Sequence, residues 1–386
     1  MSEWKTYRLG DLCSRIKSGK GIPASEVSTT GEYPVIGGNG IRGYTNTSNF
    51  NGVCAVVGRQ GAYCGNVRFF SGEAYMTEHA VVIVGNELAD TRYLAYLLSI
   101  MQLGHLSAQS AQPGLSVQTL SKLSINIPDI STQRRIVGIL GSLDDKIELN
   151  RRINANLEAQ AQALFRSWFV DFEPFRDGPF VDSQLGKIPQ GWKVGTINEI
   201  IQILSGYAFK SDTFTEAGPY RLITIKNVQD GSLNIDGVAY LSEIPDKIPQ
   251  HCNLAIGDIL LSLTGNVGRV CIVDRDGLLL NQRVAKLQPK DKRNTFFTYA
   301  LFRQDSFKQY LIQIAKGTAQ LNLSPVETSN TKIVLPNQDI LLQFGEIGQP
   351  LFDNIVSNCK EIITLSALRD TLLPKLVAGE IDLENI

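Results

Sequence analysis

The chain repeats itself, and this repeat limits the folds it can adopt more than any other sequence feature. Trp4 aligns with Trp192, an offset of 188 residues, and Pro128 aligns with Pro336, an offset of 208 residues. The second copy therefore contains about 20 extra residues. A period this long does not fit a solenoid of short repeats. It predicts a duplicated domain pair.

A heptad-like pattern follows each of these prolines, because apolar residues and asparagines recur in alternating steps of four and three. In the first copy these positions are Ile136, Leu140, Leu143, Ile147, Asn150, Asn154, Leu157, Ala161, Leu164 and Trp168. In the second copy they are Phe344, Gly348, Leu351, Ile355, Asn358, Ile362, Leu365, Arg369, Leu372 and Leu376. We predict two long helices, residues 130–170 and 338–379, each about 60 Å long. Gly345, Gly348 and Pro350 should loosen or kink the start of the second helix.

Two equivalent asparagines lie near the middle of these helices. If the helices pack antiparallel about a pseudo-two-fold axis, Asn150 and Asn358 face each other at its centre. A polar residue at such a position fixes the register of a helix pair at some cost in stability. The alternative is that both are unrelated surface residues.

The stretches before the helices predict mixed α/β domains. Short apolar runs such as "VCAVVG", "AVVIVG", "YRLITI" and "DILLSL" are bounded by Gly, Asn and Asp, as strands between turns are. We expect an α+β fold with two similar mixed domains, residues 1–129 and 186–337, separated by two long antiparallel coiled-coil helices. Residues 171–185, rich in Pro, Gly and Asp, are the expected linker.

Charge differs modestly between the regions of the chain. The net charge is −1, from 37 basic and 38 acidic residues. By region, residues 1–128 carry 10 basic and 8 acidic groups, and residues 186–336 carry 17 and 13. The predicted domains are therefore slightly basic and the helical regions acidic. Such weak charge suits a DNA reader that borrows positive charge from partners, or simply solvated surfaces.

The chain shows no signal for export or for a membrane. No apolar run approaches the roughly 20 residues of a membrane span, and the first residues contain no signal-peptide stretch. The six cysteines form no CxxC motif, so we expect reduced thiols and a cytoplasmic location.

Two motifs resemble catalytic signatures in the wrong context. Residues 38–43 satisfy GxGxxG, but "YTNTSNFNG" follows instead of a helix, which favours a glycine-rich turn or a DNA-facing loop. Pro128-Asp129 with Asp144-Asp145-Lys146 imitates a PD…DxK nuclease, yet the second element lies inside the heptad pattern. His79, His105 and His251 are scattered and supply no metal cluster. We therefore expect no catalytic residues and no bound metal.

The helical segments carry a family resemblance. "STQRRIVGILGSLDDKIELNRRINANLEAQAQALFRSWFVDFEPF" closely resembles the central region of type I restriction–modification specificity subunits, and "LRDTLLPKLVAGEI" resembles their carboxy-terminal region. "YPVIGGNGIRGY" and "DILLSLTGNVGRVCIV" are similar to segments of their target-recognition domains. The resemblance covers nearly the whole chain.

This resemblance implies two target-recognition domains that each read half of a split, asymmetric site in double-stranded DNA. It also implies that the helices set the gap between half-sites and dock two modification (methyltransferase) subunits, with restriction (translocase–nuclease) subunits joining for cleavage. S-adenosylmethionine, ATP and Mg²⁺ would then belong to these partners. Independently, two similar domains on a rigid spacer suit half-sites centred about one DNA turn apart.

Base edges are read mainly by Arg, Lys, Asn, Gln and hydroxyl side chains. We expect DNA contacts from loop residues of the first copy: Lys17, Lys20, Asn39, Arg42, Arg59, Gln60, Tyr63 and Gln112. In the second copy the candidates are Lys210, Lys226, Asn227, Asn266, Arg269, Gln282, Arg283 and Lys316. Arg59 and Arg269 stand out because each follows an apolar strand among glycines. The alternatives are a coiled-coil scaffold that binds protein, and a nuclease or methyltransferase in its own right.

Overall fold

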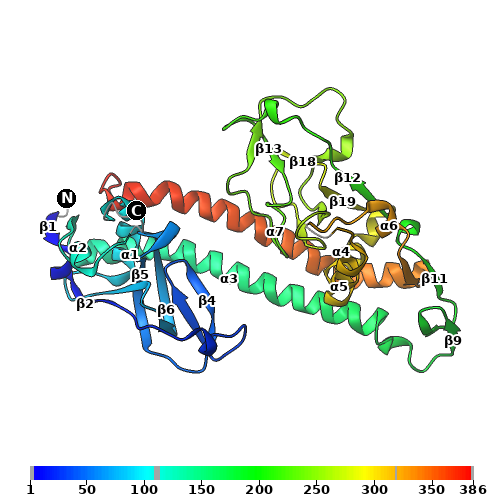
Figure 1. Cartoon of the computed structure of the whole chain (residues 1–386), viewed down its shortest axis with the longest axis horizontal. Helices are drawn as coiled ribbons and strands as arrows, with labels where there is room; N and C mark the ends of the chain where they lie inside the picture. Colours follow the sequence, from blue (N-terminus) through cyan, green and yellow to red (C-terminus); the bar gives the residue numbers. More distant parts are fainter. Residues whose placement is uncertain (1–3, 108–113, 318–319, 384–386) are drawn as a thin grey trace. The chain divides into compact units, whose positions relative to one another are not determined.

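The computed structural model describes residues 4–107, 114–317 and 320–383. The chain divides into two compact units, the first formed by Met1–Ile147 with Thr364–Ile386 and the second by Glu148–Ile363. Both boundaries fall inside long helices, α3 (Ile130–Phe169) and α7 (Gln338–Val377), labelled in Figure 1. Each unit therefore contains part of both helices together with its own sheets.

The first unit is built on a six-stranded sheet. Its strands are β2 (Cys13–Ser18), β3 (Tyr33–Gly37), β4 (Gly40–Thr45), β5 (Phe50–Gly58), β6 (Val67–Met76) and β7 (Ala80–Gly85). Their order is β2-β7-β5-β6-β3-β4, and only β3 and β6 pair in parallel. The apolar runs "VCAVVG" and "AVVIVG" form the buried parts of β5 and β7, as their composition predicts.

A helix and a short ladder complete this unit. Helix α1 (Thr91–Ile100) packs on β5, β6 and β7, and the Asp90 carboxylate caps it by accepting from the N–H groups of Arg92 and Tyr93. The remaining elements are β1 (Lys5–Arg8), α2 (Val117–Ser121), β8 (Ser124–Ile127) and 3-10 turns at Leu9–Leu12, Ala24–Glu26, Gly61–Tyr63 and Leu103–Leu106. Strand β1 pairs antiparallel with β8.

The second unit has two four-stranded sheets. Their strands are β12 (Ile201–Ser205), β13 (Tyr220–Ile223), β14 (Ala239–Leu241), β15 (Asn253–Leu254), β16 (Ile259–Ser262), β17 (Val270–Ile272), β18 (Leu278–Leu280) and β19 (Val284–Pro289). The orders are β12-β19-β16-β17 and β14-β13-β18-β15.

Smaller elements surround these sheets. They are β9 (Phe180–Ser183), β10 (Gly186–Pro189), β11 (Lys193–Thr196), β20 (Lys332–Leu335), α4 (Thr295–Arg303), α5 (Asp305–Ile314) and α6 (Pro325–Ser329), with 3-10 turns at Glu173–Phe175, Ile197–Glu199, Ser211–Thr213, Gln250–Cys252 and Lys292–Asn294. Strand β11 pairs with β20 as β1 pairs with β8, and β9 with β10 forms a hairpin.

The two units follow one plan, as the sequence repeat predicts. The order β2-β7-β5 in the first unit corresponds to β12-β19-β16 in the second. Strand β6 is continuous in the first unit, whereas its counterpart is split into β17 and β18, so the sheet of the second unit divides into two. The predicted α+β fold with an internal repeat and two long helices is confirmed.

The helix residues predicted by the heptad pattern are all buried or half-buried in α3 and α7. Within the second unit the two helices run antiparallel, since Phe165 packs against Phe344 and Asn154 binds Asn358. Pairing in this sense keeps the seam residues of each helix on the buried side.

The expectation about the start of α7 needs correction. The helix is unbroken from Gln338 to Val377. A Cβ at Gly348 would lie 1.8 Å from the Phe296 ring, and a Cβ at Gly345 would lie 2.6 Å from the Arg293 carbonyl oxygen. Close packing against α4 and the turn before it, and not a break in the helix, explains these two glycines.

The two equivalent asparagines both bind residues of the opposite helix. Asn358 donates to the Asn154 side-chain oxygen at 2.8 Å, and the fully buried Asn150 donates to Glu361 at 2.8 Å. Each asparagine therefore binds a different residue of the opposite helix, and the facing of Asn150 and Asn358 at the centre of the helix pair stays a prediction. The sequence offset locates equivalent residues but does not determine which residues of antiparallel helices meet.

Candidate nucleic-acid interface

Several loops of the first unit meet at the carboxyl end of β5. We call these loops, residues 19–20, 38–39, 59–66 and 77–79, the first edge. The N–H of Arg59 donates to the His79 carbonyl at 2.9 Å, and the N–H of Lys20 donates to the Met76 carbonyl at 3.0 Å. A Cβ at Gly38 would lie 3.2 Å from Gly58 Cα. These loops are therefore in direct contact.

The corresponding loops of the second unit form a second edge, residues 206–207, 263–269 and 281–283. The N–H of Leu263 donates to the Arg283 carbonyl at 3.1 Å, and the N–H of Tyr207 donates to the Leu280 carbonyl at 2.9 Å. These are the hydrogen bonds of the first edge at equivalent positions. The glycine of the repeated dipeptide Ser18-Gly19 and Ser205-Gly206 belongs to an edge in each unit.

Backbone crowding explains this repeated glycine. A Cβ at Gly19 would lie 2.0 Å from the Met76 carbonyl oxygen, and a Cβ at Gly206 would lie 2.3 Å from the Asn281 carbonyl oxygen. Only glycine lets the backbone approach the neighbouring loop this closely.

One further segment joins each edge. The N–H of Leu115 donates to the Arg59 carbonyl at 2.8 Å, and the N–H of Leu323 donates to the Leu263 carbonyl at 2.7 Å. These residues are 208 positions apart. The segments before α2 and α6 thus occupy equivalent places, and their polar side chains are added to the two edges.

The structure brings most predicted residues of the first copy to its edge. Lys20, Asn39, Gln60 and Tyr63 are exposed, Tyr63 with 52% of its surface accessible, and Arg59 is half-buried. Arg42 lies beside this group, because its side-chain carbons would meet a Cβ placed on Gly37. Lys17 is exposed near the end of β2. Gln112 lies outside the described residues.

In the second copy the edge contains the exposed residues Asn266, Gln282 and Arg283 together with the half-buried Arg269. Lys316 lies next to it, through a bridge to Asn322, and forms an ion pair with Glu327. Lys210 and Lys226 are exposed on the segments after β12 and β13.

Asn227 is a wrong prediction for DNA contact. Its side chain is buried, with 3% of the residue surface accessible. Its oxygen accepts from the Thr224 N–H at 2.9 Å, and its amide donates to the Asn234 carbonyl at 2.9 Å. Both polar ends hold the surrounding loop together, so the side chain serves that loop and not a ligand.

Arg59 and Arg269 are not equivalent residues. Arg59 corresponds to Leu263, which is buried, because each accepts the hydrogen bond from the segment before α2 or α6. Arg269 corresponds to Asn66, because Gly58 donates to Asn66 as Ser262 donates to Arg269. Arg59 therefore lies at the start of its loop, whereas Arg269 lies at the end of the equivalent loop in the second unit.

Sequence reasoning missed other polar residues at these edges. Arg68 is exposed on β6, and its Nη2 donates to the Asn39 oxygen at 3.3 Å. Thr264 donates from Oγ1 to Asn322 Oδ1 at 2.8 Å. The position of Arg68 just after the glycine-containing loop, as for Arg269, was a usable signal. The pairing of Thr264 with Asn322 joins residues 58 positions apart, so no local pattern reports it.

The residues that imitate a nuclease are engaged in structural contacts. Asp144 accepts from Tyr96 Oη at 2.5 Å and from Arg369 Nη1 at 2.8 Å, which ties α1 and α7 to α3. Asp129 caps α3, and hydrogen bonds from Thr132 and Ser131 hold the pKa of its carboxyl below the ordinary value. The two carboxylates stabilise helices.

Other catalytic chemistry finds little support. In the part of the chain that the structure describes, no group of three or more His, Cys, Asp or Glu side chains could hold a metal ion. All six cysteines are free thiols. Burial raises the pKa of Cys13 to about 12 and that of Cys359 to about 11, so neither is a thiolate at neutral pH.

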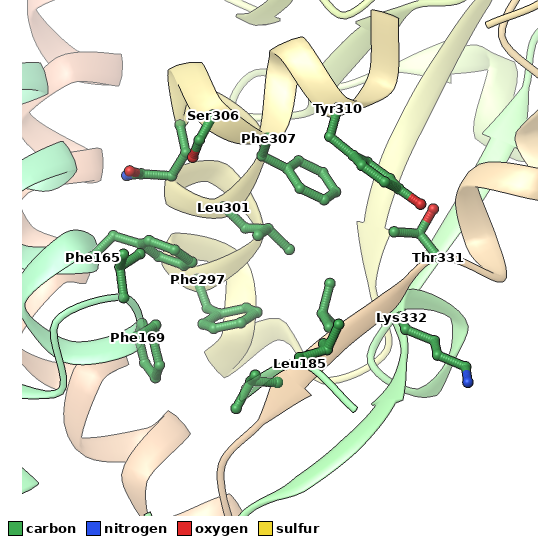
Figure 2. Close-up of a pocket in the computed structure, with 14 residues that line it drawn as sticks. Phe165, Phe169, Leu185, Phe297, Leu301, Ser306, Phe307, Tyr310, Thr331 and Lys332 are labelled. Carbon is green, nitrogen blue, oxygen red and sulfur yellow. The ribbon is translucent and has the colours of Figure 1, made fainter. Parts of the chain in front are cut away.

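A cavity of about 320 Å³ lies in the second unit between α3, α4, α5 and β20. Figure 2 shows the rings of Phe165, Phe169, Phe297 and Phe307 around it, with Lys332 extending away from them. Its described lining includes no Asp, Glu, His or Cys. The cavity has the character of an apolar contact surface and lacks an acid–base pair.

Over the described residues, no helix has both the length and the apolar character needed to cross a membrane.

The chain contains two copies of one mixed α/β domain. Each copy has an edge of basic and amide side chains and packs on long helices. These features define a class of duplicated recognition proteins. A family model described as "Type I restriction modification DNA specificity domain" matches residues 1–159 and 189–357. The chain belongs to this family, and the resemblance carried by its helical segments is confirmed.

Named relatives agree with this assignment. The chain is 30% identical over 306 residues to the type I restriction enzyme MjaIX specificity subunit of Methanocaldococcus jannaschii, covering 77% of this chain and 70% of the relative. It is 28% identical over 328 residues to the HindI specificity subunit of Haemophilus influenzae, covering 70% and 71%. A crystal structure of a type I S subunit from M. genitalium has the same fold, with a TM-score of 0.58, 18% identity and coverage of 97% and 96%.

Proposed function

We propose that this chain is the DNA-recognition subunit of a type I restriction–modification complex. Each edge reads one half of a split, asymmetric site, and a non-specific gap lies between the halves. One observation carries the proposal: the two edges share the same backbone hydrogen bonds while their exposed side chains differ. A common frame with different side chains suits two domains that read different base sequences.

The proposed readers are the exposed or half-buried polar residues of both edges. Arginine recognises guanine and Asn or Gln recognises adenine most strongly in the major groove, while Lys binds phosphate. The candidates are Lys17, Lys20, Asn39, Arg42, Arg59, Gln60, Tyr63 and Arg68 in the first copy, and Lys210, Lys226, Asn266, Arg269, Gln282, Arg283, Lys316 and Asn322 in the second.

The catalytic work belongs to partner subunits in this proposal. Two modification subunits and the restriction subunits would supply S-adenosylmethionine, ATP and Mg²⁺ chemistry, and this chain would itself be non-catalytic. The net charge of −1 supports that division, because a chain with so little positive charge gains little from phosphate attraction alone. Its affinity for DNA should rise when the modification subunits join.

The experiment is methylome sequencing of a host that expresses this chain with its modification subunit. The expected result is a split motif, methylated in both halves and absent when this chain is omitted. Adding one heptad to both α3 and α7 should lengthen the gap and leave the half-sites unchanged, because the 40-residue helices act as the spacer. A continuous motif, or methylation without this chain, would contradict the proposal.

A further inference from the structure

Some of the extra residues of the second copy lie next to the second edge. In the first unit Tyr33 pairs with Thr45, 12 positions away, across the tight turn between β3 and β4. The equivalent pair in the second unit, Tyr220 and Leu241, is 21 positions apart. The added chain forms a loop, residues 224–238, where the first unit has only residues 38–39.

This loop is an ordered structure with its own core. Val228, Leu233 and Val238 are buried in a cluster together with residues of β16, β17 and β18. The buried Asn227 ties the start of the loop to Asn234, as described above. Loop 224–238 therefore has a defined geometry, so the position of one end of the loop determines the position of the other end.

One residue of the loop holds Arg269. Gln229 Oε1 accepts from Arg269 Nη1 at 2.6 Å. The other end of the Gln229 amide donates from Nε2 to the Lys226 carbonyl at 2.8 Å, so the carbonyl end is turned toward the arginine. The Gly231 N–H donates to the Val270 carbonyl at 2.8 Å, which holds the loop against the residue after Arg269. The guanidinium is thereby oriented by a neutral partner.

The next residue anchors the loop to the helical part of the unit. Asp230 accepts hydrogen bonds from Arg303 on α4 and from Lys308 on α5. Arg303 Nε in turn donates to Glu158 on α3 at 2.8 Å, and Tyr299 also donates to Glu158. The chain of contacts runs from Arg269 at the edge, through loop 224–238, to α3.

The charged side chains in this chain of contacts fall into two sets. Asp230 and Glu158 balance Arg303 and Lys308, whose side chains are only 15% and 24% exposed, so these two cations are not available to phosphate. Burial opposes ionisation of Asp230, but Lys308 and Arg303 hold its pKa below the ordinary value. Arg269, by contrast, is oriented by an uncharged amide and keeps its positive charge for a ligand.

We propose that loop 224–238 is a brace in which Gln229 is a positioning residue for Arg269, so that discrimination at the second half-site depends on a residue that itself reads no base. This rests on the proposed function, in which Arg269 contacts DNA. The first edge has only residues 38–39 in the equivalent place, where the Asn39 side-chain oxygen accepts from Arg68 Nη2 at 3.3 Å. A neutral amide at position 229 suits the task, because a carboxylate there would neutralise the reader.

The test uses the assembled methyltransferase complex and DNA duplexes that carry the split motif found by methylome sequencing. Affinities are measured for the motif and for single base-pair changes in each half-site. Arg269→Ala should lower discrimination at one base pair of the second half-site by about 5- to 150-fold. Gln229→Ala should lower discrimination at the same base pair less, by about 3- to 10-fold, and should have no further effect in the Arg269→Ala background.

Gln229→Glu separates positioning from mere structural support. It retains an acceptor for Arg269, so its melting temperature should equal or exceed that of the parent, while its affinity for the second half-site should fall at least as far as that of Gln229→Ala. Gln313→Ala, an exposed glutamine on α5, is the matched control and should change neither quantity. Discrimination at the first half-site should stay constant in all these variants and should fall in Arg59→Ala.

Three results would overturn the brace. The first is a loss from Gln229→Ala that adds fully to that of Arg269→Ala; the second is Gln229→Glu binding DNA as the parent does. Unchanged discrimination in Arg269→Ala would also overturn it, by removing the residue to be positioned. Failure of the proposed function differs from all three, because the parent complex itself would then show no discrimination in either half-site.

Discussion

The two units have the same domain plan but build it from different numbers of residues. In the first, β6 is a single strand of 10 residues that joins all six strands into one sheet. In the second, β17 and β18 share that role, and loop 224–238 adds a separate buried cluster. The backbone contacts at the two edges are nevertheless the same. Insertions are therefore tolerated in the connections, whereas the edge frame and the helix contacts recur.

The helix contacts also differ in content between the units. Phe344 of the second unit is fully buried and meets the rings of Phe165, Phe169 and Phe296, among others. The equivalent residue of the first unit is Ile136, which is 1% exposed in a mainly aliphatic cluster that also contains Tyr93 and Tyr96. Aromatic rings bury more area per residue, so the second unit gains more from each helix contact.

The largest expected effect tests this difference. Phe344→Ala should lower the free energy of unfolding of the second unit by about 4 kcal/mol, and Ile136→Ala should lower that of the first by about 3 kcal/mol. Urea unfolding followed by hydrogen exchange in each unit measures both. If Ile136→Ala proved the more costly, the aromatic cluster would not be the stronger of the two helix contacts.

A glycine pair gives a smaller effect with opposite signs. A Cβ at Gly348 would overlap the Phe296 ring, whereas a Cβ at Gly138 would meet nothing within 4 Å. Gly348→Ala should therefore destabilise by about 2 kcal/mol, and Gly138→Ala should stabilise by about 0.8 kcal/mol through helix propensity.

Thermal unfolding of the two glycine variants measures both changes in stability. Stabilisation by Gly348→Ala would mean that α7 is indeed loosened there, as its sequence suggests. Destabilisation by Gly138→Ala would point to a contact on that face of α3.

Periodic features were predictable from the sequence, and contacts between distant residues were not. The spacing of Leu140, Ile147 and Ala161 reports a buried helix stripe directly, because such a stripe needs only one element. Asn227 binds Thr224 and Asn234, three and seven positions away, but its burial comes from the fold around it, so the sequence did not distinguish it from an exposed base reader.

The candidate site shows the same division. The glycines around Arg59 and Arg269 correctly marked both loops as parts of the edges. They did not show which positions correspond. Gly58 is equivalent to Ser262 and Asn66 to Arg269, but the loop between Gly58 and Asn66 is one residue longer than the loop between Ser262 and Arg269. Hydrogen bonds from the segments before α2 and α6, 56 and 60 positions away, fix the correspondence.

The last expected effect concerns the helix asparagines of the second unit. Asn358 donates to Asn154 at 2.8 Å, and both side chains are half-buried. Asn358→Leu should destabilise by about 1 kcal/mol, because it leaves the Asn154 oxygen without that partner. The double variant Asn154→Leu/Asn358→Leu should cost less than the sum of the two single changes, because both polar groups are then replaced by apolar ones.

A double-mutant cycle from urea unfolding gives this coupling, with Asn156→Leu, at an exposed position of α3, as the control. Equal and additive costs would mean that the amide pair contributes no coupling to the helix contact. The alternative outcome is a coupling of about 1 kcal/mol together with hydrogen exchange that spreads over more of residues 148–163 in the double variant. This outcome would show that the asparagines select one register of the helix pair and add little to its stability. The pairing would then be a register device of the second unit, because the equivalents of Asn154 and Asn358 are Ile362 and Asn150, which cannot form the same amide pair.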